Sequence, residues 1–159
     1  NLSLLGTGVI NGTGNAGGNR LTGNGVANKL DGLEGADTID GGLGNDIITG
    51  GGGADSIDAS KGNDRLVYTE VIDAGDTVTG FDANPVGGQD IVDLDALFDN
   101  LLIAPGARAG RVALVDNAGS TEVRVDVDGV GGDFEVLLVT LANAPVATVS
   151  VGADVVLGS

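Results

Sequence analysis

The chain has 159 residues and a formal net charge of −16, with 23 acidic residues against seven basic ones. This length suits one domain or two small ones, and the charge repels nucleic-acid phosphates and anionic membrane surfaces, so we expect no nucleic-acid partner. Because the chain has no cysteine and no histidine, disulfides, zinc sites of thiolates or imidazoles, and histidine-based nucleophilic triads are excluded.

The N-terminal stretch predicts two short strands and no targeting element. Leu2 to Leu5 form the first predicted strand, and Val9 and Ile10 the second, with a glycine-rich turn between them. No apolar run reaches the roughly 20 residues that a bilayer requires, and the start lacks the pattern of a secretory signal peptide. We therefore expect no membrane insertion. Because Asn1 lies in repetitive sequence, we also expect the chain to be part of a longer protein.

A nine-residue repeat fills the chain from Gly14 to Val67. Its first two units, residues 14–31, are degenerate, and the next four, residues 32–67, are regular. The sixth position is always Asn or Asp, and it comprises Asn19, Asn28, Asp37, Asp46, Asp55 and Asp64. The eighth position is always Leu or Ile, and it comprises Leu21, Leu30, Ile39, Ile48, Ile57 and Leu66. A fixed period of this kind predicts a solenoid.

The two halves of each unit predict a glycine loop followed by a short strand whose apolar residue points inward. Glycines permit positive φ and bring carbonyl oxygens close together, which suits a hard cation with oxygen ligands. Between Leu30 and Ser60 the chain has seven acidic residues and no basic one, so stacked loops need a counter-ion. Aspartate and glycine also favour turns without a metal. Four units in register nevertheless favour several bound calcium ions.

The repeats resemble those of the RTX family, the hemolysin-type calcium-binding proteins of bacterial type I secretion. Gly41 to Thr49 and Gly50 to Asp58 match the family pattern Gly-Gly-x-Gly-x-Asp-x-apolar-x. The resemblance implies an all-β fold, a parallel β-roll (an RTX solenoid) in which two nonapeptides make one turn, so that loops two units apart share calcium. It implies that Asp37 pairs with Asp55 on one edge and Asp46 with Asp64 on the other. The implied carbonyl ligands are those of Gly32, Gly35, Gly41, Gly44, Gly50, Gly53 and Gly62.

Two departures from this pattern weaken the implied sites. Asn19 and Asn28 stand where the family has aspartate, and an asparagine offers a neutral carbonyl oxygen. Sites that pair Asn19 with Asp37, or Asn28 with Asp46, are therefore expected to be weaker or empty.

The residues after Val67, here called the C-terminal segment (residues 68–159), lose the period. We divide the chain into a calcium-binding roll, residues 1–67, and an antiparallel cap with one short helix, residues 68–159. The helix is predicted to begin after an Asp95 cap, with Leu94, Leu97 and Leu101 on one face. Residues 111–115 and 122–127 predict a hairpin. Further strands are predicted at residues 65–69, 77–81, 134–141, 147–151 and 154–157.

Two parts of the C-terminal segment also resemble type I-secreted proteins. Residues 75–82 and 90–97 are similar to segments that follow the roll in those proteins. The last residues, Asp154 to Leu157, resemble their uncleaved export signal, an acidic residue followed by apolar ones. The alternative is an ordinary last strand.

These features predict a non-catalytic module that couples calcium binding to folding and to type I secretion of an extracellular or surface protein, such as an adhesin. Its expected partners are calcium ions and the secretion machinery, and self-association through the roll ends stays open. An alternative is the secretion module of a secreted protease or lipase with an upstream catalytic domain. A third is an ice- or glycan-binding solenoid that uses Thr7, Thr13, Thr22, Asn11, Asn15 and Asn24.

Overall fold

The structure is a computed structural model, and it describes residues 1–84, 89–129, 136–145, 149–151 and 155–157. The strands up to the end of the repeats are β1 Leu2–Ser3, β2 Gly12–Thr13, β3 Arg20–Thr22, β4 Lys29–Asp31, β5 Thr38–Asp40, β6 Ile47–Thr49, β7 Ser56–Asp58 and β8 Arg65–Val67. The later elements are β9 Asp76–Thr79, β10 Ile91–Asp93, α1 Asp95–Asn100, α2 Pro105–Arg108, the 3₁₀ helix η1 Ala109–Arg111, β11 Val112–Asn117, β12 Ser120–Val125, β13 Val136–Ala142 and β14 Val155–Val156.

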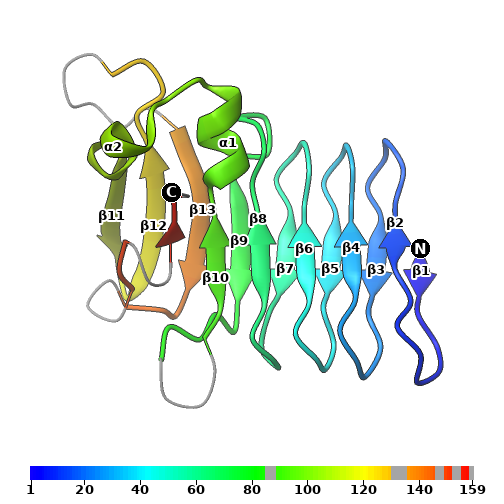
Figure 1. Cartoon of the computed structure of the whole chain (residues 1–159). Coiled ribbons are helices and arrows are strands. Elements are labelled where there is room, and N and C mark those ends of the chain that lie inside the picture. The colour runs from blue at the N-terminus through cyan, green and yellow to red at the C-terminus, as the bar shows by residue number, and fades with distance from the viewer. Residues whose placement is uncertain (85–88, 130–135, 146–148, 152–154, 158–159) are drawn as a thin grey trace.

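Successive strands of the repeats alternate between two parallel sheets (Figure 1). The first sheet has the order β1-β3-β5-β7-β9-β13-β12-β11, and the second has the order β14-β10-β8-β6-β4-β2. Within a sheet, Ile39 pairs with Ile57 and Ile48 with Leu66, a register of two nonapeptides. One turn therefore contains two units of the repeat, and the chain forms the parallel β-roll that the sequence predicted.

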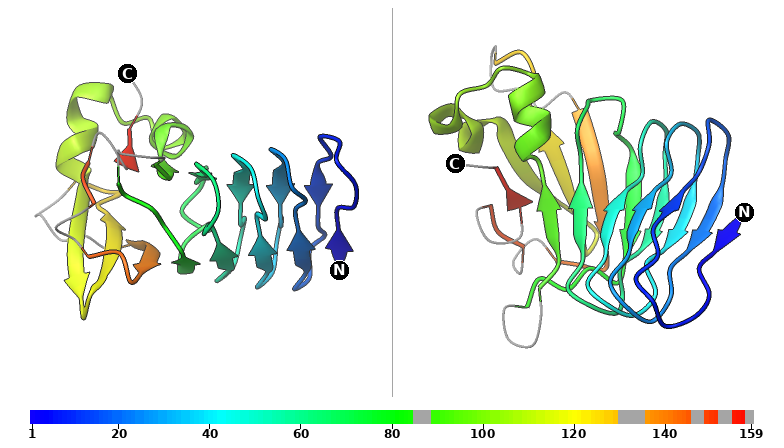
Figure 2. Two further views of the ribbon diagram at one scale, coloured as in Figure 1. Left: turned by 90° about the horizontal axis from the view of Figure 1, so that it is seen from below. Right: turned by 45° about the vertical axis from the view of Figure 1, so that its right-hand side comes forward.

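The core of the roll consists of branched side chains that both sheets direct inward, and the two sheets face each other in Figure 2. The eighth residue of every unit is the middle residue of a three-residue strand and is at most 1% exposed. Burying such a side chain stabilises the fold by about 1.5–3 kcal/mol. Because successive strand residues point to opposite faces, the seventh residues face outward and are exposed, whereas the ninth are mostly half-buried.

The predicted second strand near Val9 and Ile10 is wrong. The strand in this region is β2, and it pairs with β4 so that Gly12 lies beside Leu30. Val9 is 75% exposed in a loop. The register of two nonapeptides decides the strand's place, because it aligns Gly12 with the row of eighth-position residues, although the local pattern of apolar residues favours the earlier position.

The two parallel sheets continue beyond Val67, which corrects the prediction that only antiparallel strands follow the repeats. β9 pairs with β7, placing Val78 beside Ile57, and β10 pairs with β8, placing Val92 beside Leu66. Loops of greater length replace the nonapeptide spacing, so the period disappears from the sequence although the sheets continue. Val78 and Val92 are both fully buried and extend the core row.

The C-terminal segment combines both kinds of strand pairing. β11, β12 and β13 are antiparallel, and the β11–β12 hairpin turns at Ala118 and Gly119, which both have positive φ. β13 then pairs in parallel with β9, and β14 in parallel with β10. Without a further strand, β9 and β10 would each expose a row of unpaired backbone N–H and C=O groups. In both cases a parallel strand pairs with this edge. Asp154 and parts of the predicted strands at 134–141 and 147–151 lie outside the described residues.

The predicted short helix is α1, which lies at one end of the strands of the C-terminal segment (Figure 1). Leu94 and Leu97 are fully buried, as predicted, and Leu101 packs partly buried against the core. The predicted cap residue is wrong, because the N-cap is Leu94 and Asp95 is the first helical residue. The Asp95 carboxylate instead accepts a hydrogen bond from Arg108 at 2.7 Å. No helix within the described ranges is long and apolar enough to cross a membrane.

Candidate metal centre

The sixth-position residues form a regular ladder along each edge of the roll. On one edge, the backbone N–H of Asn19 donates to Asp37 Oδ1 at 2.5 Å, and that of Asp37 donates to Asp55 Oδ1 at 2.7 Å. On the other edge, the N–H of Asn28 donates to Asp46 Oδ1, and that of Asp46 to Asp64 Oδ1, each at 2.8 Å. The structure therefore brings together the pairs Asp37–Asp55 and Asp46–Asp64.

The second oxygen of three of these carboxylates has no hydrogen-bond donor. Oδ2 of Asp37, Asp46 and Asp55 is buried and unpartnered among the described residues. Each of these aspartates is at most 2% exposed. A buried acceptor without a donor costs about 1–3 kcal/mol, and more if it is charged. Each of these oxygens therefore lacks the donor or cation that its burial calls for.

Each unpartnered oxygen faces a small space beside a first-position glycine. A Cβ on Gly32 would collide with Asp37 Oδ2 and with the carbonyl oxygen of Gly50, one turn further on. A Cβ on Gly41 would lie 2.8 Å from Asp46 Oδ2. The Gly32 space is thus lined by a carboxylate oxygen and a carbonyl oxygen. This donor set is made of oxygen only, which fits calcium.

The fourth-position glycines make the close stacking of the loops possible. Gly35, Gly44, Gly53 and Gly62 all have positive φ. A Cβ on Gly53 would collide with the carbonyl of Gly35, and a Cβ on Gly62 with that of Gly44. The carbonyls of Gly35 and Gly44 therefore point toward the next loop of their edge. Those of Gly32, Gly41 and Gly50 point toward the first-position glycines of the preceding loop.

Burial also perturbs the titration of these aspartates. It raises the pKa of Asp46 and of Asp55 to about 6, because the ionised carboxylate loses hydration, and it raises the pKa of Asp64 for the same reason. Neighbouring carboxylates add to the rise, since like charges disfavour ionisation. A bound divalent cation stabilises the ionised forms and reverses this effect.

The two asparagines satisfy their own side chains by hydrogen bonds. The Asn19 amide donates to the carbonyl of Asn15 at 2.9 Å and also to that of Gly17. The Asn28 amide donates to the carbonyl of Ile10 at 2.7 Å, while its Oδ1 accepts from the N–H of Asn24 at 2.9 Å. These amide groups therefore donate to backbone carbonyl oxygens of residues that precede them in the chain.

Two ladder members were missed by the sequence analysis. The N–H of Asp55 donates to Asp76 Oδ1 at 2.8 Å, and the N–H of Asp64 donates to Asp90 Oδ1 at 2.7 Å. Burial raises the pKa of Asp76 to about 7 and that of Asp90 to about 6. A signal for them exists, because Asp76 and Asp90 each precede a buried valine by two residues, as sixth and eighth positions do in the repeats.

Acidic side chains alone do not form a complete metal site among the described residues. No group of three or more acidic side chains lies close enough to hold a metal by itself within the described part of the chain. A site on the ladders therefore depends on backbone carbonyls as well.

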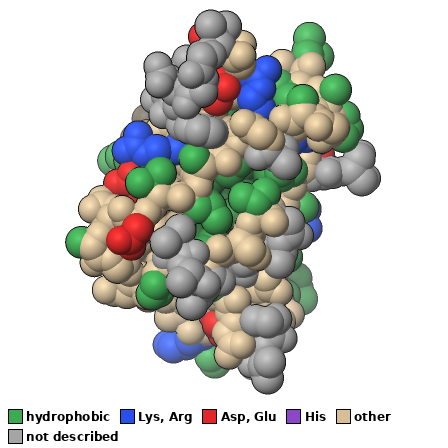
Figure 3. All heavy atoms as spheres, turned by 90° about the vertical axis from the view of Figure 1, so that its left-hand side faces the viewer, with side chains coloured by type: hydrophobic (Ala, Val, Ile, Leu, Met, Phe, Trp, Pro, Cys, Tyr) green, Lys and Arg blue, Asp and Glu red, His purple; other side chains and the backbone are tan. Residues whose placement is uncertain are grey.

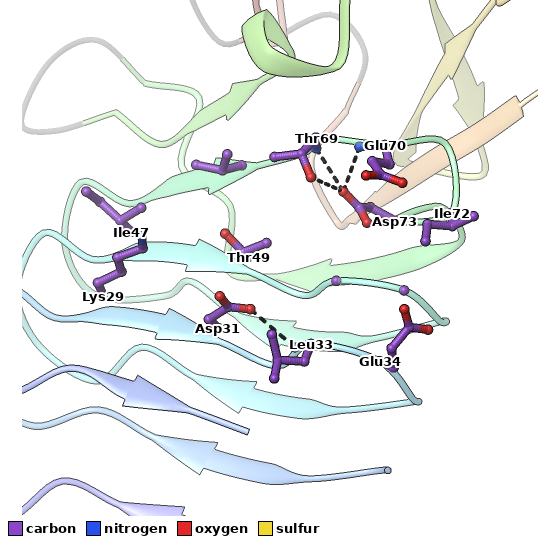
Figure 4. A pocket seen from close by; sticks show the side chains of 13 residues that line it. Lys29, Asp31, Leu33, Glu34, Ile47, Thr49, Thr69, Glu70, Ile72 and Asp73 are labelled. Carbon is purple, nitrogen blue, oxygen red and sulfur yellow. Dashed lines mark hydrogen bonds between the residues drawn. The ribbon is translucent and has the colours of Figure 1, made fainter. Parts of the chain in front are cut away.

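A separate groove of about 510 Å³ lies on the outer face of β4, β6 and β8 (Figure 4). It contains Lys29 and four carboxylates but none of the ladder aspartates.

Comparisons with known proteins agree with this geometry. Residues 13–48 and 31–66 match the family model of the RTX calcium-binding nonapeptide repeat, which has four copies. The solved structure of the AlgE6R3 subunit from the Azotobacter vinelandii mannuronan C5-epimerase is similar, with a TM-score of 0.69 and 26% sequence identity. The likeness covers 97% of this chain and 87% of that one. No curated protein sequence matches the chain.

Proposed function

We propose that this chain, whose residues 13–66 are RTX calcium-binding nonapeptide repeats, is a non-catalytic module in which calcium binding drives folding outside the cell. The unpartnered, buried oxygens of Asp37, Asp46 and Asp55 carry the proposal. Several calcium ions on the two ladders supply the charge that these oxygens lack. The proposed ligands are Asp37, Asp46, Asp55, Asp64, and the carbonyls of Gly32, Gly35, Gly41, Gly44, Gly50, Gly53 and Gly62, with weaker sites at Asn19 and Asn28.

The chain's charge makes this folding conditional on calcium. The net charge is −16, and the ladder stacks carboxylates one turn apart, about 4.8 Å in a parallel sheet. Without cations, repulsion and desolvation favour the unfolded chain. A site with calcium at ten times its dissociation constant stabilises the folded state by about 1.4 kcal/mol, so several sites can fold a marginal roll.

This dependence suits type I secretion to the outside of a bacterial cell. At low cytosolic calcium the repeats stay unfolded, which permits passage through a channel, and at higher external calcium they fold. Residues 154–157 are the proposed export signal, and the secretion machinery is the proposed partner. β14, within this stretch, pairs with β10, so folding of the roll removes part of the signal from solution.

The likeness to a repeat subunit of a mannuronan C5-epimerase favours a second candidate, a module attached to an extracellular enzyme, over an adhesin. The alternative of a secretion module attached to a secreted protease or lipase belongs to this class. Sequence upstream in the full-length protein distinguishes the two, because an enzyme carries catalytic motifs there and an adhesin carries repeated sandwich domains. The ice- or glycan-binding alternative has less support, since Thr13 and Thr22 lie on different sheets.

Circular dichroism in chelator and in millimolar calcium tests the proposed function. We expect the β signal to appear on addition of calcium and to disappear on chelation, whereas magnesium at the same concentration should have a smaller effect. A chain that is equally folded in both solutions would falsify the proposal.

A further inference from the structure

The last repeat loop on the first edge meets the C-terminal segment at Asp55 and Asp76. One regular turn after Asp55 the sequence places Asp73, but three additional residues separate the strands, and Asp76 takes the ladder position. Asp55 and Asp76 are 2% and 1% exposed. A ladder step at this junction therefore joins a nonapeptide aspartate to one from outside the repeats.

Asp73, in the loop before β9, has a carboxylate oxygen that is satisfied by hydrogen bonds and needs no cation. Its Oδ2 accepts hydrogen bonds from the N–H and hydroxyl of Thr69 at 2.8 and 3.0 Å, and from the N–H of Glu70 at 2.9 Å (Figure 4). In contrast, Asp55 Oδ2 has no donor among the described residues. The unpartnered oxygen therefore lies at the junction. Asp73, which has the same formal charge, is a control residue for it.

The free oxygen of Asp55 faces a second carboxylate across a small space. A Cβ on Gly50 would collide with Asp55 Oδ2 and would lie 3.1 Å from Asp76 Oδ2. In the preceding step of the same edge, the corresponding place beside Gly32 is occupied by the carbonyl oxygen of Gly50. At the junction, a carboxylate oxygen thus replaces a carbonyl oxygen, and two carboxylates that share a site favour a cation between them.

The ion pairs of the described residues do not supply this charge. They join Arg65 to Asp93, Arg108 to Asp95 and Asp99, Arg111 to Asp126, and Arg124 to Glu122. All of their acidic partners lie between residues 93 and 126. Among the described residues, the only hydrogen-bond donor to either Oδ2 of the two junction carboxylates is a hydroxyl.

That donor is Tyr68, whose hydroxyl donates to Asp76 Oδ2 at 3.0 Å. Tyr68 is 2% exposed, and it stands two nonapeptides after Gly50, at the first position of the next unit on this edge. A carboxylate oxygen has more than one lone pair, so it can accept this hydrogen bond and also bind a metal. A hydrogen bond of this kind orients a ligand toward its metal.

We propose that Asp55 and Asp76 are ligands of a calcium site, here called the junction site, that ties the last repeat loop to the C-terminal segment, with Tyr68 as the positioning residue of Asp76. The junction site extends the proposed function and rests on it, because calcium is also the cation proposed for the ladders. The site makes docking of the loop before β9 onto the repeats dependent on calcium.

Terbium luminescence tests the junction site specifically. Tb³⁺ substitutes for calcium at oxygen sites and is sensitised by a nearby tyrosine. Tyr68 is the only tyrosine of the chain, and the chain has no tryptophan. We expect the wild-type chain to show tyrosine-sensitised terbium emission that excess calcium displaces. Strong calcium binding measured by calorimetry together with absent sensitised emission would overturn the junction site alone, whereas absent calcium binding would overturn the proposed function.

Three variants that each remove one carboxylate charge show which residues the sensitised terbium emission depends on. Asp76→Asn should weaken sensitised terbium binding about tenfold or more and remove one calcium equivalent per chain, because ligand charge sets the affinity of such sites. Asp73→Asn removes the same charge, and its carbonyl still accepts the loop's hydrogen bonds, so it should keep the emission. Asp46→Asn, on the opposite edge, should lose calcium but keep the emission. Equal emission from the Asp76→Asn and Asp73→Asn variants contradicts the proposal.

The Tyr68→Phe variant tests whether Tyr68 positions Asp76. Because it removes the tyrosine that sensitises terbium, calcium binding is measured instead of luminescence. We expect calorimetry to show one calcium equivalent bound about tenfold more weakly, with the other equivalents unchanged. A purely structural role would lower the thermal stability equally in chelator and in calcium, and would leave all calcium affinities alike. Circular dichroism in calcium verifies that each variant is folded.

Discussion

The repeats and the C-terminal segment compensate their acidic side chains in different ways. In the C-terminal segment, arginine side chains pair with carboxylates, and in Figure 3 basic side chains lie beside acidic ones on this end of the molecule. In the repeats, Asp37, Asp46 and Asp55 each bury a carboxylate oxygen without a partner among the described residues. The chain thus supplies arginine partners for carboxylates of residues 95–126, whereas among the described residues it supplies none for these three oxygens. The difference predicts that calcium acts on one region far more than on the other.

Removal of calcium is the largest expected effect. Hydrogen exchange in chelator should show β3 to β8 losing protection by orders of magnitude, while the β11–β13 sheet loses less, because its buried carboxylate Glu122 is already paired with Arg124. Refolding in calcium should restore protection. Uniform loss of protection over both regions would contradict the difference between them and indicate a single cooperative unit.

Single carboxylates should show the same contrast. Asp46→Asn should lower the free energy of unfolding by about 1.4 kcal/mol in calcium at ten times the dissociation constant. In chelator the same change should leave stability unchanged or raise it, because it removes an uncompensated buried charge.

Glu122→Gln is the matched control in the C-terminal segment. Glu122 pairs with Arg124 at 2.7 Å and also accepts a hydrogen bond from Asn117, and its pKa is lowered by the hydrogen bond from Arg124. Its replacement should destabilise the chain equally with and without calcium. Denaturant titrations of both variants in both solutions provide the measurement, and a calcium-dependent effect for Glu122→Gln would count against the contrast.

The pH dependence should reverse with calcium. Folding raises the pKa of Asp46 and Asp55 from 3.8 to about 6, and that of Asp76 to about 7. The folded state then binds protons more tightly than the unfolded state. In chelator, their stabilising contribution is complete below pH 3.8 and is lost as the pH rises through 6 to 7.

In calcium the opposite slope is expected, since protons compete with the metal for the same oxygens. Thermal unfolding at about pH 5 and about pH 7.5, with and without calcium, compares the two slopes. The metal-free chain should be more stable at the lower pH, and the calcium-bound chain at the higher pH. Slopes of the same sign in both solutions would show that the ladder carboxylates are not the ligands.

The smallest expected effect concerns backbone strain within the repeats. Leu33 has a φ of 73°, whereas the corresponding positions of the next two units are Gly42 and Gly51. A left-handed conformation costs a non-glycine residue about 1–2 kcal/mol. Leu33→Gly should therefore raise the melting temperature slightly in calcium. Leu43→Gly, at an exposed residue without positive φ, should lower it, and a fall in both would exclude strain at Leu33.

Features that follow from local spacing could be predicted from the amino-acid sequence. The nine-residue period, with the family resemblance it carries, predicted a register of two nonapeptides per turn, the inward row of Leu and Ile, and the pairs Asp37–Asp55 and Asp46–Asp64. Helix α1 and the β11–β12 hairpin also followed from local patterns. These features depend on residues that are neighbours within one turn of helix, one hairpin or one roll turn, so periodicity is sufficient to find them.

The ends of the ladders, in contrast, depend on how the strands pair in three dimensions. Continuing the period selects Asp73, yet Asp73 turns back to the N–H groups of Thr69 and Glu70, and Asp76 joins the ladder instead. Asp90 joins the other edge from 26 residues away. The physical reason is that the loops before β9 and β10 contain insertions whose lengths the nine-residue period does not encode. Pairing of β9 with β7 and of β10 with β8 then selects which aspartate reaches the edge of the roll.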